Sequence, residues 1–109
     1  MKKPLLAALF LLLTFTVKSQ VRVIHFNAGW NSLNNVSWVK DLKDCDIEFI
    51  DIAVKTKAQK EYSIVVVPTI LILQYDEETK RYQADLSFKL AATKEEVQEY
   101  IDELILSGF

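Results

Sequence analysis

An apolar run follows Pro68 in this chain and constrains its fold more than any other stretch. Residues 69–75 are TILILQY, and no charged side chain interrupts them. A strand with one wet face alternates apolar and polar side chains, whereas an unbroken run of branched residues is typical of a strand covered on both faces. The segment 65–75 is therefore a predicted strand of an α/β sheet that has helices on both faces.

Two more segments are rich in β-branched and aromatic residues, and polar or turn residues bound both of them. They are VRVIHF at 21–26 and DIEFIDI at 46–52, and each is a predicted strand. Between them apolar residues recur every three positions, at Leu33, Val36, Val39 and Leu42. This spacing predicts a helix that begins at Asn31, a good N-cap residue. Two strands joined by such a helix form a βαβ unit, so we expect them to pair in parallel.

A short helix and a turn are predicted in the second half of the chain. The segment 56–64 is expected to be helical, with Thr56 as its cap and with Ala58 and Tyr62 facing the core. The polar stretch DEETK at 76–80 is a predicted turn.

A returning strand and a last helix complete the frame. Apolar and polar side chains alternate in RYQADLS at 81–87, which predicts a returning antiparallel strand. TKEE at 93–96 is a capping box. An apolar stripe follows it at helical spacing, at Val97, Tyr100, Ile101, Leu104 and Ile105. The predicted order is β-α-β-α-β-β-α around a four-stranded mixed sheet.

Residues 1–19 have the layout of a secretory signal peptide: two lysines, an apolar run from Leu5 to Val17, and then polar residues. Val17 and Ser19 suit positions −3 and −1 of a cleavage site. Cleavage would leave a mature domain of residues 20–109, which is 109 − 19 = 90 residues. An uncleaved membrane anchor is the alternative, although the run is shorter than the ~20 residues that span a bilayer. We expect an exported protein, periplasmic or secreted, without stable membrane insertion after cleavage.

The charge balance excludes one class of partner. Without Lys2, Lys3 and Lys18 the mature domain has 13 − 3 = 10 basic residues against 15 acidic ones, a formal charge of 10 − 15 = −5. A nucleic-acid-binding domain would present a basic face, so no nucleic-acid partner is expected. Cys45 is the only cysteine, and one thiol cannot form an intramolecular disulfide or a Cys-x-x-Cys pair. Packing must therefore hold the domain together.

Two motifs resemble thioredoxins, and together they cover essentially the whole mature chain. VIHFNAGWNSLNN is similar to the segment in which an apolar strand, Phe, a variable residue, Ala, another variable residue and Trp precede Cys-x-x-Cys. KEYSIVVVPTILIL resembles the later segment in which Lys-Tyr-Gly-Ile leads to Pro-Thr and an apolar strand. In this order, on the predicted frame, they imply a thioredoxin-like fold. Because the chain begins directly with the first central strand, the extra N-terminal strand and helix of longer thioredoxins are expected to be missing.

The chain departs from this family at the residues that carry its chemistry. Where thioredoxins have Trp-Cys-x-x-Cys, this chain has Trp30, Asn31, Ser32, Leu33 and Asn34. Dithiol exchange needs an attacking thiolate and a second thiol that resolves the mixed disulfide, and a carboxamide is not a nucleophile at neutral pH. Asn31 is therefore interpreted first as a structural N-cap, with ligand contact as the alternative.

The stretch 67–69, Val-Pro-Thr, is the part of the family's site that the chain retains. The resemblance implies a cis bond before Pro68 and a neighbouring backbone that pairs with an extended peptide. The alternative is that Pro68 only begins the third strand. Trp30, if it is exposed, would add apolar contact area for such a peptide.

Other polar residues are weighed as chemical groups. His25 lies in a predicted central strand whose neighbour Phe26 points to the opposite face, which argues against a Ser32–His25 nucleophile pair. A hydrogen-bonded core histidine is favoured over a catalytic one. Cys45 lies outside the motif and is interpreted as a small buried hydrophobe in preference to a reactive thiol. No ligand spacing for a metal is present, and the sequon at 35–37 falls inside a predicted helix.

These residues favour a secreted or periplasmic thioredoxin-like domain that lacks the redox dithiol and binds an extended peptide or partner protein without catalysis. No cofactor and no metal are expected. The hypothetical binding surface consists of Trp30, Asn31, Asn34 and the backbone of Val67 and Pro68. Two alternatives stay open: a thiol-disulfide oxidoreductase, of the usual family kind or using Cys45, and a structural or assembly subunit.

Overall fold

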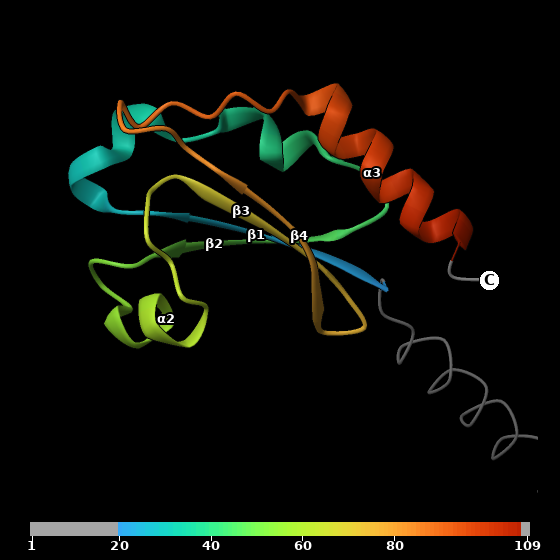
Figure 1. The fold of residues 1–109 in the computed structure, drawn as a ribbon, viewed down its shortest axis with the longest axis horizontal. Coiled ribbons are helices and arrows are strands. Elements are labelled where there is room, and N and C mark those ends of the chain that lie inside the picture. The colour runs from blue at the N-terminus through green and yellow to red at the C-terminus, as the bar shows by residue number, and fades with distance from the viewer. Residues whose placement is uncertain (1–19, 108–109) are drawn as a thin grey trace, which may run out of the picture.

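The computed structural model describes residues 20–107, and its sheet has the strand order β2-β1-β3-β4 (Figure 1). The strands are β1 (Val21–Asn27), β2 (Asp46–Asp51), β3 (Thr69–Gln74) and β4 (Glu77–Gln83). β1 pairs with β2 in parallel and with β3 antiparallel, and β3 pairs with β4 antiparallel. The predicted mixed sheet is confirmed. The predicted signal peptide lies outside the described residues.

Helical elements lie on both faces of the sheet, as expected (Figure 1). One face carries two 3-10 helices and a long α-helix: η1 (Gly29–Asn34), η2 (Ser37–Asp41) and α3 (Lys94–Ser107). The other face carries only the short helix α2 (Thr56–Glu61). None of the helices in this described part of the chain is long and apolar enough to cross a membrane.

The core is divided into two layers by the sheet. The layer under α2 contains Ile24 and Phe26 of β1, and the layer under η2 and α3 contains Val21 and Val23 of the same strand. This alternation follows from the period of two along a strand. Every residue from Thr69 to Leu73 is buried, so the prediction of a strand covered on both faces is confirmed.

The first predicted helix is wrong in kind. A single helix beginning at Asn31 was expected, whereas the chain forms η1 and η2 with extended backbone between them at Asn35 and Val36. The cause is long-range, because the Val36 N–H donates to Nε2 of His25 at 3.0 Å and not to a helical carbonyl. The N-cap position of η1 is Ala28, which makes no side-chain cap, so the assignment of Asn31 as N-cap is also wrong.

The spacing of apolar residues in this segment has a different meaning from the one expected. A repeat of three residues matches the three residues per turn of a 3-10 helix better than the 3.6 of an α-helix. Val36, Val39 and Leu42 are buried at this spacing, on one side of η2. Leu33 continues the repeat in sequence but is 99% exposed, since η1 turns away from the core.

The hairpin formed by β3 and β4 turns earlier in the chain than predicted. Both the turn at 76–80 and the strand at 81–87 are misplaced, because β4 already starts at Glu77. Tyr75 and Asp76 have φ values of 51° and 67°, and positive φ at both central residues defines a tight two-residue hairpin turn. Residues 77–80, which were predicted to form a turn, instead belong to the edge strand β4. Charged side chains on an edge strand hinder its pairing with a strand of another molecule.

The two α-helices agree with their predicted inner faces. α2 ends at Glu61, three residues before the predicted end; Ala58 is buried in it, and its C-cap residue Tyr62 packs against Phe26 with 5.2 Å between ring centroids. Thr56 is the first helical residue of α2 and not its cap, which is Lys55. At the start of α3, the Glu96 N–H donates to Oγ1 of Thr93 at 3.2 Å, as a capping box requires.

Candidate functional site

Three segments meet at one end of the sheet, where β1 ends and β3 begins (Figure 1). They are η1, the segment 62–68 before β3, and the segment 84–90 after β4. Trp30 in η1 is 69% exposed, and its ring meets Phe88 edge-on with 5.6 Å between centroids. This end therefore presents aromatic surface that the core does not use.

Four asparagines hold η1 in place. The side-chain amide of Asn27 donates to the carbonyl oxygen of Asn31 at 3.0 Å and to Oδ1 of Asn35. Asn31 Nδ2 donates in return to Oδ1 of Asn27 at 3.0 Å, and Asn34 Nδ2 donates to Oδ1 of Asn31 at 2.7 Å. We call these residues the asparagine network. Asn27 and Asn31 are buried, Asn34 is half-buried and Asn35 is exposed, so the network runs from the interior to the surface and pairs the polar groups of its buried members.

The asparagine network occupies the side chains of Asn31 and Asn34, two of the predicted binding residues. Asn31 is only 5% exposed, and both ends of its amide are occupied within the chain. Asn34 is half-buried and has its amide nitrogen engaged, which leaves its oxygen toward solvent. Sequence reasoning missed Asn27 and Asn35, although four asparagines within nine positions, 27 to 35, were visible.

Asp51 ties the start of η1 to the end of β2. Its Oδ1 accepts the N–H of Gly29 at 3.2 Å and the N–H of Ala53 at 2.9 Å. A Cβ placed on Gly29 would lie 3.2 Å from the other carboxylate oxygen, a distance tighter than ordinary contact. A larger residue at position 29 would push η1 away from the carboxylate that anchors it.

His25 is a buried acceptor in the floor of the site. It is 2% exposed, its Nε2 accepts the Val36 N–H, and its ring lies 4.9 Å from that of Phe49. Within residues 20–107 no hydrogen bond links His25 to Ser32, whose side chain is exposed. Burial lowers the pKa of His25 below its ordinary value, because the charged ring would lose its hydration. The neutral ring is the form that can accept the Val36 bond.

Protonation of His25 is expected to destabilise the fold. The folded pKa is lower than the value of about 6.5 in an unfolded chain, so the unfolded state binds the proton more tightly. This contribution to stability is complete above about pH 6.5 and is lost as the pH falls through the folded pKa. Urea unfolding of the wild type should show a decline in this window that His25→Gln lacks, because the glutamine oxygen accepts without titrating. Equal pH slopes for the two proteins would contradict this role.

In the segment before β3, two described residues have backbone groups without hydrogen bonds: Val65, which is exposed to solvent, and Val67, which is buried. The Val67–Pro68 peptide bond is cis, and the Pro68 carbonyl accepts the Ala84 N–H at 3.0 Å. Thr69 Oγ1 donates to the Val66 carbonyl at 2.6 Å. Among the hydrogen bonds of residues 20–107, none involves the N–H or the C=O of Val67. Val67 and Pro68 are both buried, and Val67 is only 4% exposed as a whole residue, so its side chain offers no contact surface.

Arg81 holds this segment against the sheet. From β4 its guanidinium donates to the carbonyls of Tyr62 and Ser63 at 2.7 and 2.9 Å, where α2 ends. The same group pairs with Glu78 through two bonds of 3.0 and 2.8 Å. Cations are favourable at the C-terminal end of a helix, where carbonyls lack partners. Nothing in the sequence near Arg81 indicated this contact, since it joins positions 18 and 19 residues apart.

Cys45 lies outside the site and is a poor nucleophile. The side chain is half-buried and packs at the border of the core layer under α3. Burial, aided by Asp46 and Asp44, raises the pKa of its thiol to about 11. Only about one thiol in ten thousand is then ionised at pH 7. No group of three His, Cys, Asp or Glu side chains in the described part of the chain is arranged to hold a metal ion.

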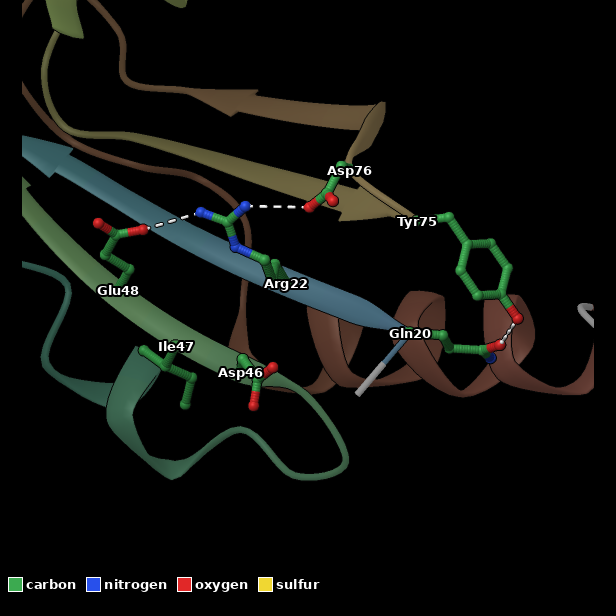
Figure 2. Close-up of a pocket in the computed structure, with 7 residues that line it drawn as sticks. All are labelled: Gln20, Arg22, Asp46, Ile47, Glu48, Tyr75 and Asp76. Carbon is green, nitrogen blue, oxygen red and sulfur yellow. Dashed lines mark hydrogen bonds and ion pairs between the residues drawn. The ribbon is translucent and has the colours of Figure 1, made fainter. Parts of the chain in front are cut away.

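A cleft of about 740 Å³ lies at the opposite end of the sheet (Figure 2). At its centre, Arg22 donates to Glu48 at 2.9 Å and to Asp76 at 3.1 Å. Tyr75 and Gln20 form a second contact at its edge, in which the Tyr75 hydroxyl donates to Gln20 Oε1. The central cation is therefore already paired, and the cleft is distant from the exposed aromatic surface.

Comparison with known proteins shows the fold. No protein-family model matches the sequence, and a search of curated proteins finds no match. Among solved structures, the chain is similar to a mutant thioredoxin from Halobacterium salinarum NRC-1, with a TM-score of 0.63 and 16% identity over 78% of this chain and 74% of that one. Thioredoxin 1 from the thermophilic eubacterium Thermosipho africanus has a TM-score of 0.61 and 23% identity, and the match covers 81% of this chain and 99% of that one. Fasciola hepatica thioredoxin has a TM-score of 0.57 and 20% identity, and the match covers 89% of this chain and 92% of that one. The expected thioredoxin-like fold is confirmed.

Proposed function

We propose that this chain is an exported thioredoxin-like domain that binds an extended segment of another protein and does not catalyse thiol-disulfide exchange. The binding surface consists of the exposed ring of Trp30, the backbone of Val67 beside Pro68, and Asn34 at the rim. Asn31 serves this surface by holding η1 in shape through the asparagine network. Export is proposed from the signal-peptide layout of residues 1–19.

The observation that carries the proposal is the free backbone of Val67. Buried backbone groups are nearly always paired, and here a donor and an acceptor on one residue have no partner within residues 20–107. An extended peptide laid beside Val67 would satisfy both groups, as when a strand is added to a sheet edge. Trp30 at the same end offers a rigid apolar surface for a side chain of that peptide.

The absence of exchange chemistry is argued from the residues of η1. Asn31 and Asn34 stand where a dithiol would be needed, and their amides are bonded to one another. Cys45 lies in another part of the fold, and its high pKa keeps it protonated at neutral pH. A redox role would therefore require a thiol that this end of the molecule does not present.

The test follows the Val67 amide in an NMR titration. The probe is a set of extended peptides with apolar residues at alternate positions, added to the protein labelled with ¹⁵N. The Val67 amide is expected to shift and to become protected from solvent exchange. With Trp38→Phe as background, Trp30 is the only tryptophan, and its fluorescence should change in parallel.

Two variants and one activity assay complete this test. Trp30→Ala should weaken binding about tenfold, as for an aromatic residue in the centre of an interface. Tyr75→Ala removes an equally exposed aromatic residue at the other end of the sheet and should leave affinity unchanged. The proposal fails if no peptide moves the Val67 amide, or if the wild type reduces insulin faster than the dithiothreitol control.

A further inference from the structure

A groove lined by both apolar and polar side chains lies beside the proposed peptide surface. It has a volume of about 360 Å³ and runs between the 3-10 helices and the segment that follows β4. Its apolar lining residues are Leu33, Val36, Trp38, Phe88 and Leu90. Figure 1 shows the segment after β4 passing along η1 and η2 on its way to α3. Leu33 is 99% exposed there, which is costly for a side chain with no partner.

The far wall of the groove is a fixed turn. Oδ1 of Asp85 accepts the Ser87 N–H at 2.8 Å, the Ser87 hydroxyl at 2.6 Å and the Lys89 N–H at 3.1 Å. The Ser87 hydroxyl and these amides hold the pKa of Asp85 below its usual range. The turn places Phe88 at a φ of 66°, an unusual conformation for a bulky residue. It also leaves Leu86 95% exposed, so the fold maintains two apolar side chains at the surface.

One charged residue lines the groove. It is Lys89, and no carboxylate is among the lining residues. Lys89 forms no ion pair with another residue in the described range 20–107. The carboxylate of Asp85 nearby accepts three donors of its own turn at Oδ1, and it forms no ion pair with Lys89 within residues 20–107. A groove of this composition is complementary to apolar side chains accompanied by one acid.

We propose that this groove binds the continuation of the extended partner segment, through apolar side chains that contact Leu33, Leu86 and Phe88 and an acidic side chain that pairs with Lys89. This inference rests on the proposed function, because the Val67 backbone is what orients the segment as an extended strand. The contact between Trp30 and Phe88 makes the groove continuous with the surface at Val67.

A second copy of the chain is a poorer occupant on the grounds of charge. The mature domain has a formal charge of −5, so two copies repel one another at long range. A symmetric contact through the groove would also bring Lys89 of one copy toward Lys89 of the other. Like charges placed together across an interface disfavour that pairing. A segment that carries a single acid faces a weaker long-range repulsion than a second copy does, and it places no second lysine beside Lys89.

The test compares two peptides that differ at one position. Both are extended and apolar at alternate residues, and one carries Glu where the other carries Lys. The Glu peptide should bind the wild type about threefold to tenfold more tightly, a range suited to one exposed charge pair. Lys89→Glu should reverse that preference. Leu33→Ser and Leu86→Ser together should weaken both peptides about tenfold, while Leu106→Ser, equally accessible on α3, should change nothing.

The outcomes separate this inference from the proposed function. If the peptides protect the Val67 amide but neither the charge reversal nor the Leu33 and Leu86 changes alter affinity, the groove proposal is wrong and the proposed function stands. If no peptide moves Val67, both fail. A mass from light scattering that doubles with concentration, and returns to the monomer value in Leu33→Ser, would assign the groove to a second copy and overturn the inference.

Discussion

Asn27→Ala is expected to lower the free energy of unfolding by about 2 to 4 kcal/mol, one of the largest single effects available in this chain. Asn27 is 4% exposed, and its amide makes three hydrogen bonds, to the Asn31 carbonyl, the Asn31 side chain and the Asn35 side chain. Truncation leaves the buried groups of Asn31 without partners, and each such group costs about 1 to 3 kcal/mol. Urea unfolding followed by circular dichroism measures the loss.

Asn34→Ala is the matched control for this prediction. It removes one member of the same network, but Asn34 is half-buried, and water can replace its single bond to Asn31. A change of about 0.5 to 1 kcal/mol is expected, typical of one partly exposed hydrogen bond. If the two alanine variants were equally stable, the asparagine network would not be the structural anchor of η1. Asn27→Asp, which removes the donors and buries a charge, should be at least as damaging as Asn27→Ala.

Local patterns were enough to predict the parts of the fold whose structure depends on neighbours in sequence. The apolar run in β3 and the stripe of α3 are such patterns, because a strand buried on both faces and an amphipathic helix each leave a periodic trace. The capping contact at Thr93 joins residues three apart, so it too was visible. From these elements and two short motifs, the order of the strands along the chain and the mixed four-stranded sheet could be predicted correctly.

The segment after β1 could not be predicted in this way, because distant side chains determine its backbone. His25 accepts the Val36 N–H from 11 residues away, and Asn27 donates to the side-chain oxygen of Asn35 eight residues away. Those bonds break a continuous helix into η1 and η2. Propensity alone favoured an N-cap at Asn31, and tertiary hydrogen bonding prevailed over it. The hairpin was misplaced for a related reason: the polarity of an edge strand resembles that of a turn.

The candidate site was predicted in outline but not in the roles of its residues. Trp30 is exposed and the backbone of Val67 is free, as a peptide-binding surface needs. Asn31 was assigned to the surface because its position in the motif is that of a reactive residue, yet the chain buries it. No sequence pattern indicated the contacts of Arg81, because its partners are backbone carbonyls that only the fold brings near it. Position in a motif therefore pointed to the candidate site, and the contacts in the structure determine how each of its residues is held.

Asn31→Cys combined with Asn34→Cys is expected to give a protein that forms a disulfide and catalyses its exchange. The side-chain amides of Asn31 and Asn34 are joined by a hydrogen bond of 2.7 Å, so we expect the sulfurs that replace them to be within reach of one another. In a Cys45→Ser background, thiol titration of the unfolded chain should find two thiols after reduction and none after oxidation with glutathione. Insulin reduction driven by dithiothreitol should then exceed the uncatalysed rate, whereas the parent chain should not raise it.

The single variants distinguish chemistry from geometry in this experiment. Asn34→Cys alone, at the half-buried position, should form a mixed disulfide with glutathione but should not turn over, because no second thiol releases the substrate. Asn31→Cys alone should react more slowly, since position 31 is 5% exposed. Two thiols that remain titratable after oxidation would mean that η1 cannot bring these positions together. Formation of the disulfide together with turnover of insulin would mean that this end of the sheet retains the geometry for thiol-disulfide exchange. The proposed lack of exchange in the parent chain would then be due to the asparagines at positions 31 and 34.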